Sequence, residues 1–289
     1  MDEHPHRSVR ARRPGVRLTE RDRRVLAFAA EHRLLSIDHV GALLEISEAA
    51  AGTLLRRLCT AGVLRRPRVL QGSPRCVQIT PIGLAVIGSS LPPPRRDVRE
   101  PDHDLGLGWL WLAAHGGTFG RLHEILSERQ LRSHDEAPER SGRPLAVRLG
   151  GLGPGGRERL HYPDLLLIRP DNRRIAVELE LTGKGRTRLE KILGGYAADP
   201  RIDVVLYLVP NRAIARSVEA AARKIGIAPR VHVQFVHQPD LERRERAASA
   251  ERVRAVHGAD HRAGADRGAG ADRRAGADRR ADADRELLR

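Results

Sequence analysis

Residues 161–196 read HYPDLLLIRPDNRRIAVELELTGKGRTRLEKILGGY, and the fold predicted for the chain is built outward from them. Two apolar runs, 165–168 and 175–181, flank the segment 169–173, whose Pro, Asp and Asn residues are typical of turns. The pattern predicts two antiparallel strands, followed by a helix. In a hairpin that folds about Asp171, residues equidistant from Asp171 along the chain lie opposite each other.

That register brings acidic side chains together where apolar ones would be expected. It places Asp164 across from Glu178, with Cβ atoms about 5 Å apart. Glu180 shares their face, because side chains two residues apart on a strand point the same way. Three carboxylates in an apolar hairpin repel each other and lose solvation, which a cation relieves.

All-oxygen ligands suit Mg²⁺, Mn²⁺ or Ca²⁺, and Mg²⁺ is common where phosphates are the substrate. The sequence therefore predicts a divalent metal site, with Mg²⁺ as the expected ion, at Asp164, Glu178 and Glu180. The alternative is that Glu178 and Glu180 lie on the solvated face of an edge strand, balanced by neighbouring arginines.

The order of these motifs resembles the PD-(D/E)xK nuclease superfamily. Pro163-Asp164 matches its PD, and Glu178-Leu179-Glu180 matches its E-x-K strand with the lysine replaced. More narrowly, the segment AVELELTGK at 176–184, followed by a basic helix ending in Tyr196, resembles the replication-relaxation family. Those are bacterial proteins linked to plasmid and mobile-element maintenance. The resemblance covers roughly residues 18–236, and implies an N-terminal winged helix.

The resemblance also implies further catalytic residues. A helix before the hairpin often carries an additional acid, and in a helix from Phe119 to about Leu131 we expect Glu128, with Glu124 one turn earlier. The alternative for both is an exposed helix face. The superfamily's lysine positions the attacking water, and here Glu180 takes its place. A displaced lysine would be Lys184 or Lys191, between which the sequence does not choose. In a nuclease of this kind, Asp164 and Glu178 would hold the metal ion.

Composition favours a polyanionic partner. The formal charge is +15 over 289 residues, and nearly all of the positive charge is arginine. Two cysteines without a C-x-x-C pair indicate neither a zinc ribbon nor a disulfide framework. The N-terminus lacks the apolar core of a signal peptide, and no apolar run reaches membrane-spanning length. We expect a cytoplasmic protein that binds double-stranded DNA and does not enter a membrane.

Changes in composition divide the chain into five parts. Helical spacing of apolar residues, N-caps at Thr19, Ser36 and Ser47, and two later strands give the element order of a winged helix-turn-helix. After it comes a segment with three consecutive prolines, and the chain ends in Gly-Ala-Asp repeats without apolar positions. We expect a disordered basic arm over 1–17, a winged helix-turn-helix over 18–88, a linker over 89–104, a PD-(D/E)xK-like domain over 105–238 and a disordered low-complexity tail over 239–289. For residues 105–238 we expect an α/β fold, namely a restriction-endonuclease-like mixed sheet with helices on its faces.

In a winged helix the third helix enters the major groove and the hairpin lies on the backbone or minor groove. Arginine suits both places, because it pairs with phosphate and reads guanine. The alternative is a winged helix that binds protein. The residues expected to contact DNA are Thr53, Arg56 and Arg57 on the third helix, Arg65, Arg66, Arg68 and Arg75 around the hairpin, and Arg186 and Arg188 beyond the acids.

Three functions follow from these observations. The first is a DNA-binding protein of plasmid or mobile-element replication or relaxation that carries a metal-dependent nuclease or nickase site. The second is a non-catalytic DNA-binding regulator of replication or transcription that keeps the nuclease fold as a scaffold. The third is an interaction adaptor whose winged helix binds protein.

Overall fold

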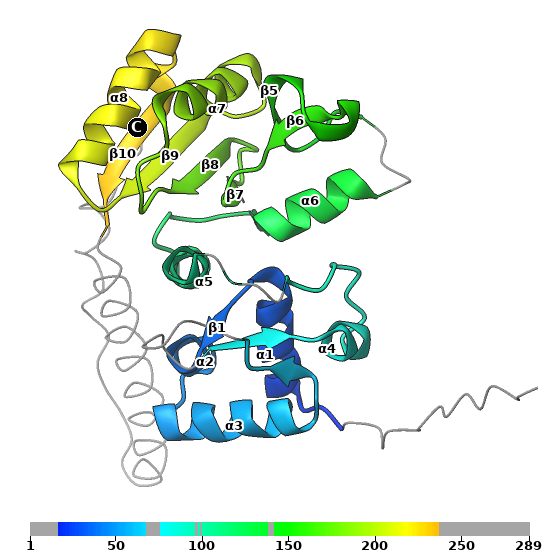
Figure 1. The fold of residues 1–289 in the computed structure, drawn as a ribbon. Helices are drawn as coiled ribbons and strands as arrows, with labels where there is room; N and C mark the ends of the chain where they lie inside the picture. Colours follow the sequence, from blue (N-terminus) through cyan, green and yellow to red (C-terminus); the bar gives the residue numbers. More distant parts are fainter. Residues whose placement is uncertain (1–16, 68–75, 96–97, 99, 138–141, 237–289) are drawn as a thin grey trace, which may run out of the picture. The chain divides into compact units, whose positions relative to one another are not determined.

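The computed structural model describes residues 17–67, 76–95, 98, 100–137 and 142–236 of the chain. These residues form a mixed α/β structure of helices and a mixed sheet (Figure 1). The predicted basic arm, apart from Arg17, lies outside the described residues, as do Arg68, Arg75 and the predicted tail with its repeats. No helix among the described residues combines the length and apolar character needed to cross a bilayer.

The N-terminal module, residues 17–95, contains four helices and a small antiparallel sheet in its described part. The helices are α1 (Glu20–Glu31), α2 (Ile37–Leu44), α3 (Glu48–Thr60) and α4 (Pro81–Val86). The strands are β1 (Leu35–Ser36), β2 (Leu64–Arg65) and β3 (Cys76–Ile79), in the order β1-β3-β2. This is the predicted succession of three helices and two later strands.

Side-chain caps set where these helices begin. The Thr19 hydroxyl accepts from the Asp22 N–H, and the Asp22 carboxylate accepts from the Thr19 N–H, so the predicted N-cap at Thr19 forms a capping box. Ser36 caps α2 and Ser47 caps α3, as predicted. Behind the caps, the apolar faces meet in a core that includes Val25 and Leu58, each buried completely.

The C-terminal module, residues 100–236, is built on a five-stranded sheet. Its helices are α5 (Pro101–His115), α6 (Glu128–Glu136), α7 (Arg186–Ala198) and α8 (Arg212–Ile225). Its strands are β4 (Glu124–Ser127), β5 (Val147–Leu152), β6 (Glu158–His161), β7 (Leu165–Ile168), β8 (Arg174–Leu179), β9 (Val204–Val209) and β10 (Val231–Phe235), with short 3-10 helices at Pro154–Gly156 and Ala228–Arg230. The main sheet has the order β10-β9-β8-β7-β4, and β5 and β6 form a separate pair.

The predicted hairpin register is confirmed. Leu165 pairs with Val177 and Leu166 with Ala176 across the antiparallel strands β7 and β8. The turn between them closes where Asn172 adopts a left-handed backbone with φ of 65°, a conformation that asparagine tolerates better than most residues. Strands β8, β9 and β10 run parallel, which makes the sheet mixed.

Alternate residues along the strands pack into two different hydrophobic cores, one on each face of the sheet. One face, with Leu166, Ala176 and Tyr207, packs against α7 and α8, which lie together on one side of the sheet in Figure 1. The other face, with Leu165 and Val177, packs against Leu110 and Ala114 of α5 and other apolar side chains. The sheet therefore lies between two helical layers.

Two local predictions were wrong. Residues 124–127 form the strand β4, which pairs with β7, where a helix from Phe119 was expected. Helix α5 begins at Pro101, inside the predicted linker, because proline fits the first turn of a helix. A strand at 145–149 that turns at 154–156 into the strand before His161 was also expected, and β5 and β6 form this pair, but outside the main sheet, where β4 takes the edge position.

Candidate functional site

The three predicted acids lie at one end of β7 and β8. Glu178 belongs to β8, Glu180 follows that strand directly, and Asp164 directly precedes β7. Only 2% of Glu178 and 3% of Glu180 is exposed, because β8 lies between β7 and β9. The alternative of a solvated edge strand is therefore wrong. The Leu179 N–H donates to Asp164 Oδ2 at 2.8 Å and joins the two strands at the acids.

Two donors share one carboxylate oxygen of Glu178. His161, at the end of β6, donates from Nε2 to Oε1 at 2.7 Å, and Tyr196 of α7 donates its hydroxyl hydrogen to the same atom. Burial alone would raise the pKa of Glu178, but the charge and hydrogen bond of His161 lower it. Burial alone would lower the pKa of His161, but Glu178 raises it. Both shifts therefore favour the ion pair between the Glu178 carboxylate and the His161 imidazolium.

Lys184 provides the cation next to Glu180. Its Nζ donates to Glu180 Oε2 from the loop that follows β8, while Lys191 is exposed on α7. Burial opposes the charge of Lys184, but the charges of Glu178 and Glu180 raise its pKa. Burial also raises the pKa of Glu180, and Lys184 offsets this only in part because the other acids are near. Of the two lysines considered from the sequence, Lys184 is the one at the acids.

A second histidine reaches the acids from α5. His103 Nε2 lies 3.3 Å from Asp164 Oδ2. Burial alone would lower the pKa of His103, but the hydrogen bond and charge of Asp164, with Asp104 and Glu100 nearby, raise it to about 9. The acid cluster, which we define as Asp164, Glu178, Glu180, Lys184, His103 and His161, thus holds three carboxylates and three basic side chains, each bonded to one of the carboxylates.

This balance bears on the predicted metal. Each carboxylate already accepts from a side-chain donor, and among the described residues no group of three or more His, Cys, Asp or Glu side chains is arranged to hold a metal ion. The residues as arranged do not fit a divalent ion. Magnesium at Asp164, Glu178 and Glu180 stays a prediction.

Glu128 lies outside the acid cluster. It begins α6, and its carboxylate accepts from Arg33 at 2.8 Å and from Arg132 at 2.8 Å. Its backbone N–H donates to the Asp164 carbonyl at 3.1 Å, and Glu128 and Asp164 line one small cavity, but the Glu128 carboxylate bonds to the two arginines. Glu124, the other candidate, is exposed on β4. The structure therefore pairs Asp164 with His103 of α5 rather than with the predicted acid.

The residues predicted to contact DNA from α3 differ in how free they are. Thr53 and Arg56 are exposed and bonded to each other at 2.9 Å. Arg57 instead forms an ion pair with the fully buried Asp22 of α1. An arginine held in this way stabilises the module, and its charge is partly neutralised.

Near β2, Arg65 donates to Gln78 and to the Pro94 carbonyl at 3.0 Å, which ties the strands to the segment that follows α4. Arg66 is exposed, and so is Arg188 at the start of α7. Arg186 pairs with Glu190 at 2.9 Å. Of the predicted contact residues that the structure describes, Thr53, Arg56, Arg66 and Arg188 are the most available to a ligand.

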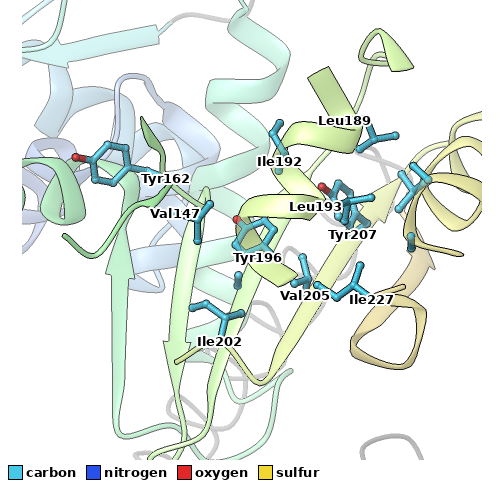
Figure 2. Packing of buried hydrophobic residues seen from close by; sticks show 14 of the residues in the cluster. Val147, Tyr162, Leu189, Ile192, Leu193, Tyr196, Ile202, Val205, Tyr207 and Ile227 are labelled. Carbon is cyan, nitrogen blue, oxygen red and sulfur yellow. The ribbon is translucent and has the colours of Figure 1, made fainter. Parts of the chain in front are cut away.

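Sequence reasoning missed three residues of the site or its lining: His103, His161 and Tyr196. Tyr196 carried a signal, because it continues the buried stripe of Leu189, Ile192 and Leu193 at helical spacing and so faces the sheet (Figure 2). His161 stands three residues before Asp164, on a strand that had been expected there. His103 gave no such signal, because it lies within the segment interpreted as a linker.

Comparisons with protein-family models, with curated proteins and with solved structures found no match to this chain. The resemblance to the replication-relaxation family therefore depends on the motif residues and the order of elements.

Proposed function

We propose that this chain is a double-stranded DNA-binding protein that uses its C-terminal module as a nuclease-like scaffold without metal-dependent cleavage. The observation that carries this proposal is the acid cluster, in which Lys184, His161 and His103 each bond to a carboxylate. A catalytic metal would have to compete with these donors. A role in replication or transcription control of a plasmid or mobile element is what the family resemblance implies.

The N-terminal module would act as the winged helix. The order of three helices and two strands, and the solvent-facing side of α3, support this assignment. Because Arg57 and Arg65 are bonded within the module, the proposed DNA contacts on it are Thr53, Arg56 and Arg66. A surface of exposed arginines binds a polyanion better than it binds most proteins, so DNA is the favoured ligand.

A metal-dependent nickase is the second candidate. The observation that favours it is the position of Lys184, whose ammonium group reaches Glu180 at the point where the superfamily's E-x-K motif has lysine. Expected nuclease residues would then be Asp164, Glu178, Glu180 and Lys184. Cleavage of plasmid DNA distinguishes this candidate from the first.

The test of DNA binding is fluorescence anisotropy with a labelled duplex of about 30 base pairs at several salt concentrations. We expect log K to fall linearly with log salt, with a slope of about −0.9 for each phosphate contacted. Arg56→Ala should weaken binding, while Arg216→Ala, an exposed arginine on α8, should not. Absence of binding at low salt would overturn the proposal.

A further inference from the structure

Strand β6 presents basic side chains on the face that meets the acid cluster. His161 ends this strand and bonds to Glu178. Arg159 lies two residues earlier and therefore points to the same face. Arg157 lies two residues before Arg159 and has an extended backbone, with φ of −80° and ψ of 146°. The alternation of side chains between the two faces therefore continues through Arg157, which points to the same face. The three side chains form a line with a spacing of about 7 Å.

The opposite face of the β5–β6 pair is different. Arg148 pairs with Leu160 across the strands, and its guanidinium bonds to Glu158 at 3.0 Å. This pair neutralises its own charges. Arg157 and Arg159, in contrast, are exposed and form no ion pair with any acid that the structure describes. Uncompensated positive charge is thus concentrated on the face that leads to Glu178.

The base of the β5–β6 pair is fixed on α7. Val147 is buried to 1% exposure and pairs with His161. A Cβ atom at Gly195 of α7 would lie 2.8 Å from the Arg148 carbonyl oxygen, so the strand and the helix touch through their backbones. The line of basic side chains is therefore held in a fixed direction relative to the acid cluster.

We propose that Arg157 and Arg159 form a phosphate track, a pair of exposed cations that guides the backbone of duplex DNA toward His161 and the Glu178 end of the acid cluster. The inference rests on the proposed DNA binding and adds a second contact surface to it. Duplex DNA fits because its backbone repeats its negative charges along a line, as the track repeats its positive ones. A single free phosphate would engage only one position of such a line.

The experiment measures duplex binding against salt for two double variants of the full chain. Arg157→Ala with Arg159→Ala removes two charges from the track, and Arg212→Ala with Arg216→Ala removes two exposed charges from α8. We expect the track variant to reduce the steepness of the salt dependence by about 1 to 2, and the α8 variant to leave it near that of the unchanged protein. All four positions are exposed, and circular dichroism verifies that both variants are folded.

Each outcome decides the inference. Equal slopes for the track variant and the unchanged protein would overturn the track while leaving DNA binding intact. Equal losses in both variants would show a general charge effect and overturn it as well. No binding by the unchanged protein would remove the proposed function and the track together. As a second readout, a photoactivatable cross-linker on Arg159→Cys should capture the duplex, and one on Arg216→Cys should not.

Discussion

Tyr196 of α7 donates its hydroxyl hydrogen to Glu178 of β8, at the same carboxylate oxygen that His161 contacts. A helix on the face of the sheet thus holds a buried acid from the strand below it. The neighbouring Tyr207 lies beside Glu178 on β9, and its hydroxyl has no hydrogen-bond partner among the described residues. Figure 2 shows both tyrosines in one core.

These two tyrosines give a matched pair of variants. Tyr196→Phe leaves Glu178 with one donor fewer, and should lower the free energy of unfolding by about 1–3 kcal/mol. Tyr207→Phe removes a buried hydroxyl without a described partner, and should be neutral or stabilising. Urea denaturation measures both. Equal effects of the two substitutions would show that the Tyr196 hydrogen bond does not add to the free energy of unfolding.

Lys184→Gln tests the ion pair with Glu180. Glu180 is buried to 3% exposure, so loss of its cation should lower the free energy of unfolding by about 1–3 kcal/mol, reduced by the partial exposure of Lys184. Replacing Glu180 by Gln in the same chain should restore part of this loss. Lys191→Gln, an exposed lysine on α7, is the control and should change stability by less than about 0.5 kcal/mol. If Lys184→Gln behaved like Lys191→Gln, Lys184 would not be the partner of Glu180.

Adjacent glycines in α7 test how the β5–β6 pair is attached. Gly195→Ala places a Cβ 2.8 Å from the Arg148 carbonyl oxygen, and should destabilise the protein by about 1–3 kcal/mol. Gly194→Ala meets no atom within 4 Å, and should stabilise the helix by up to about 1 kcal/mol. Thermal unfolding compares the two. A loss in both variants would mean that the close approach of helix and strand is not the cause.

The sign of one pH effect follows from His39, which is fully buried on α2. Burial lowers its pKa to about 3, against an unfolded value of about 6.5. The unfolded chain therefore takes up this proton first, so the contribution of His39 to stability is complete above pH 6.5 and falls between pH 6.5 and 3. The loss has an upper limit of about 1.4 kcal/mol per pH unit. Acids such as the half-buried Glu31 and the buried Asp104, whose pKa values desolvation raises to about 7 and about 6, act in the opposite direction.

Because these effects overlap, the measurement is a difference between two chains. His39 accepts from the Ser36 N–H in the capping box of α2, a position where glutamine serves equally well. We expect His39→Gln to gain stability relative to the unchanged protein as the pH falls below 6.5. Parallel stability curves for the two chains would contradict the assignment.

Local chemistry explains why much of the fold could be predicted. The turn at Asn172 fixes the register of β7 against β8, and so fixed the expectation that Asp164 and Glu178 converge. The caps at Thr19, Ser36 and Ser47 likewise depend on residues only three positions away. Where the residue that determines a turn or a cap lies within a few positions, the sequence pattern was enough to predict it.

The wrong or missing predictions concern residues whose partners lie far away in the sequence. Residues 124–127 are a strand because β7, about forty residues later, is there to pair with them. His103 and Lys184 meet the acids only after α5 and the loop after β8 have taken their places. The charge balance of the acid cluster, on which the proposed function is argued, is therefore a property of the folded chain.

The most direct test of the central claim is a gel of supercoiled plasmid incubated with the full chain in Mg²⁺ or Mn²⁺. The account predicts that the plasmid is retarded in a salt-sensitive way and stays supercoiled, because the carboxylates of the acid cluster are bound by the protein's own cations. Nicked plasmid that disappears in an Asp164→Ala variant would contradict it and establish the nickase in its place.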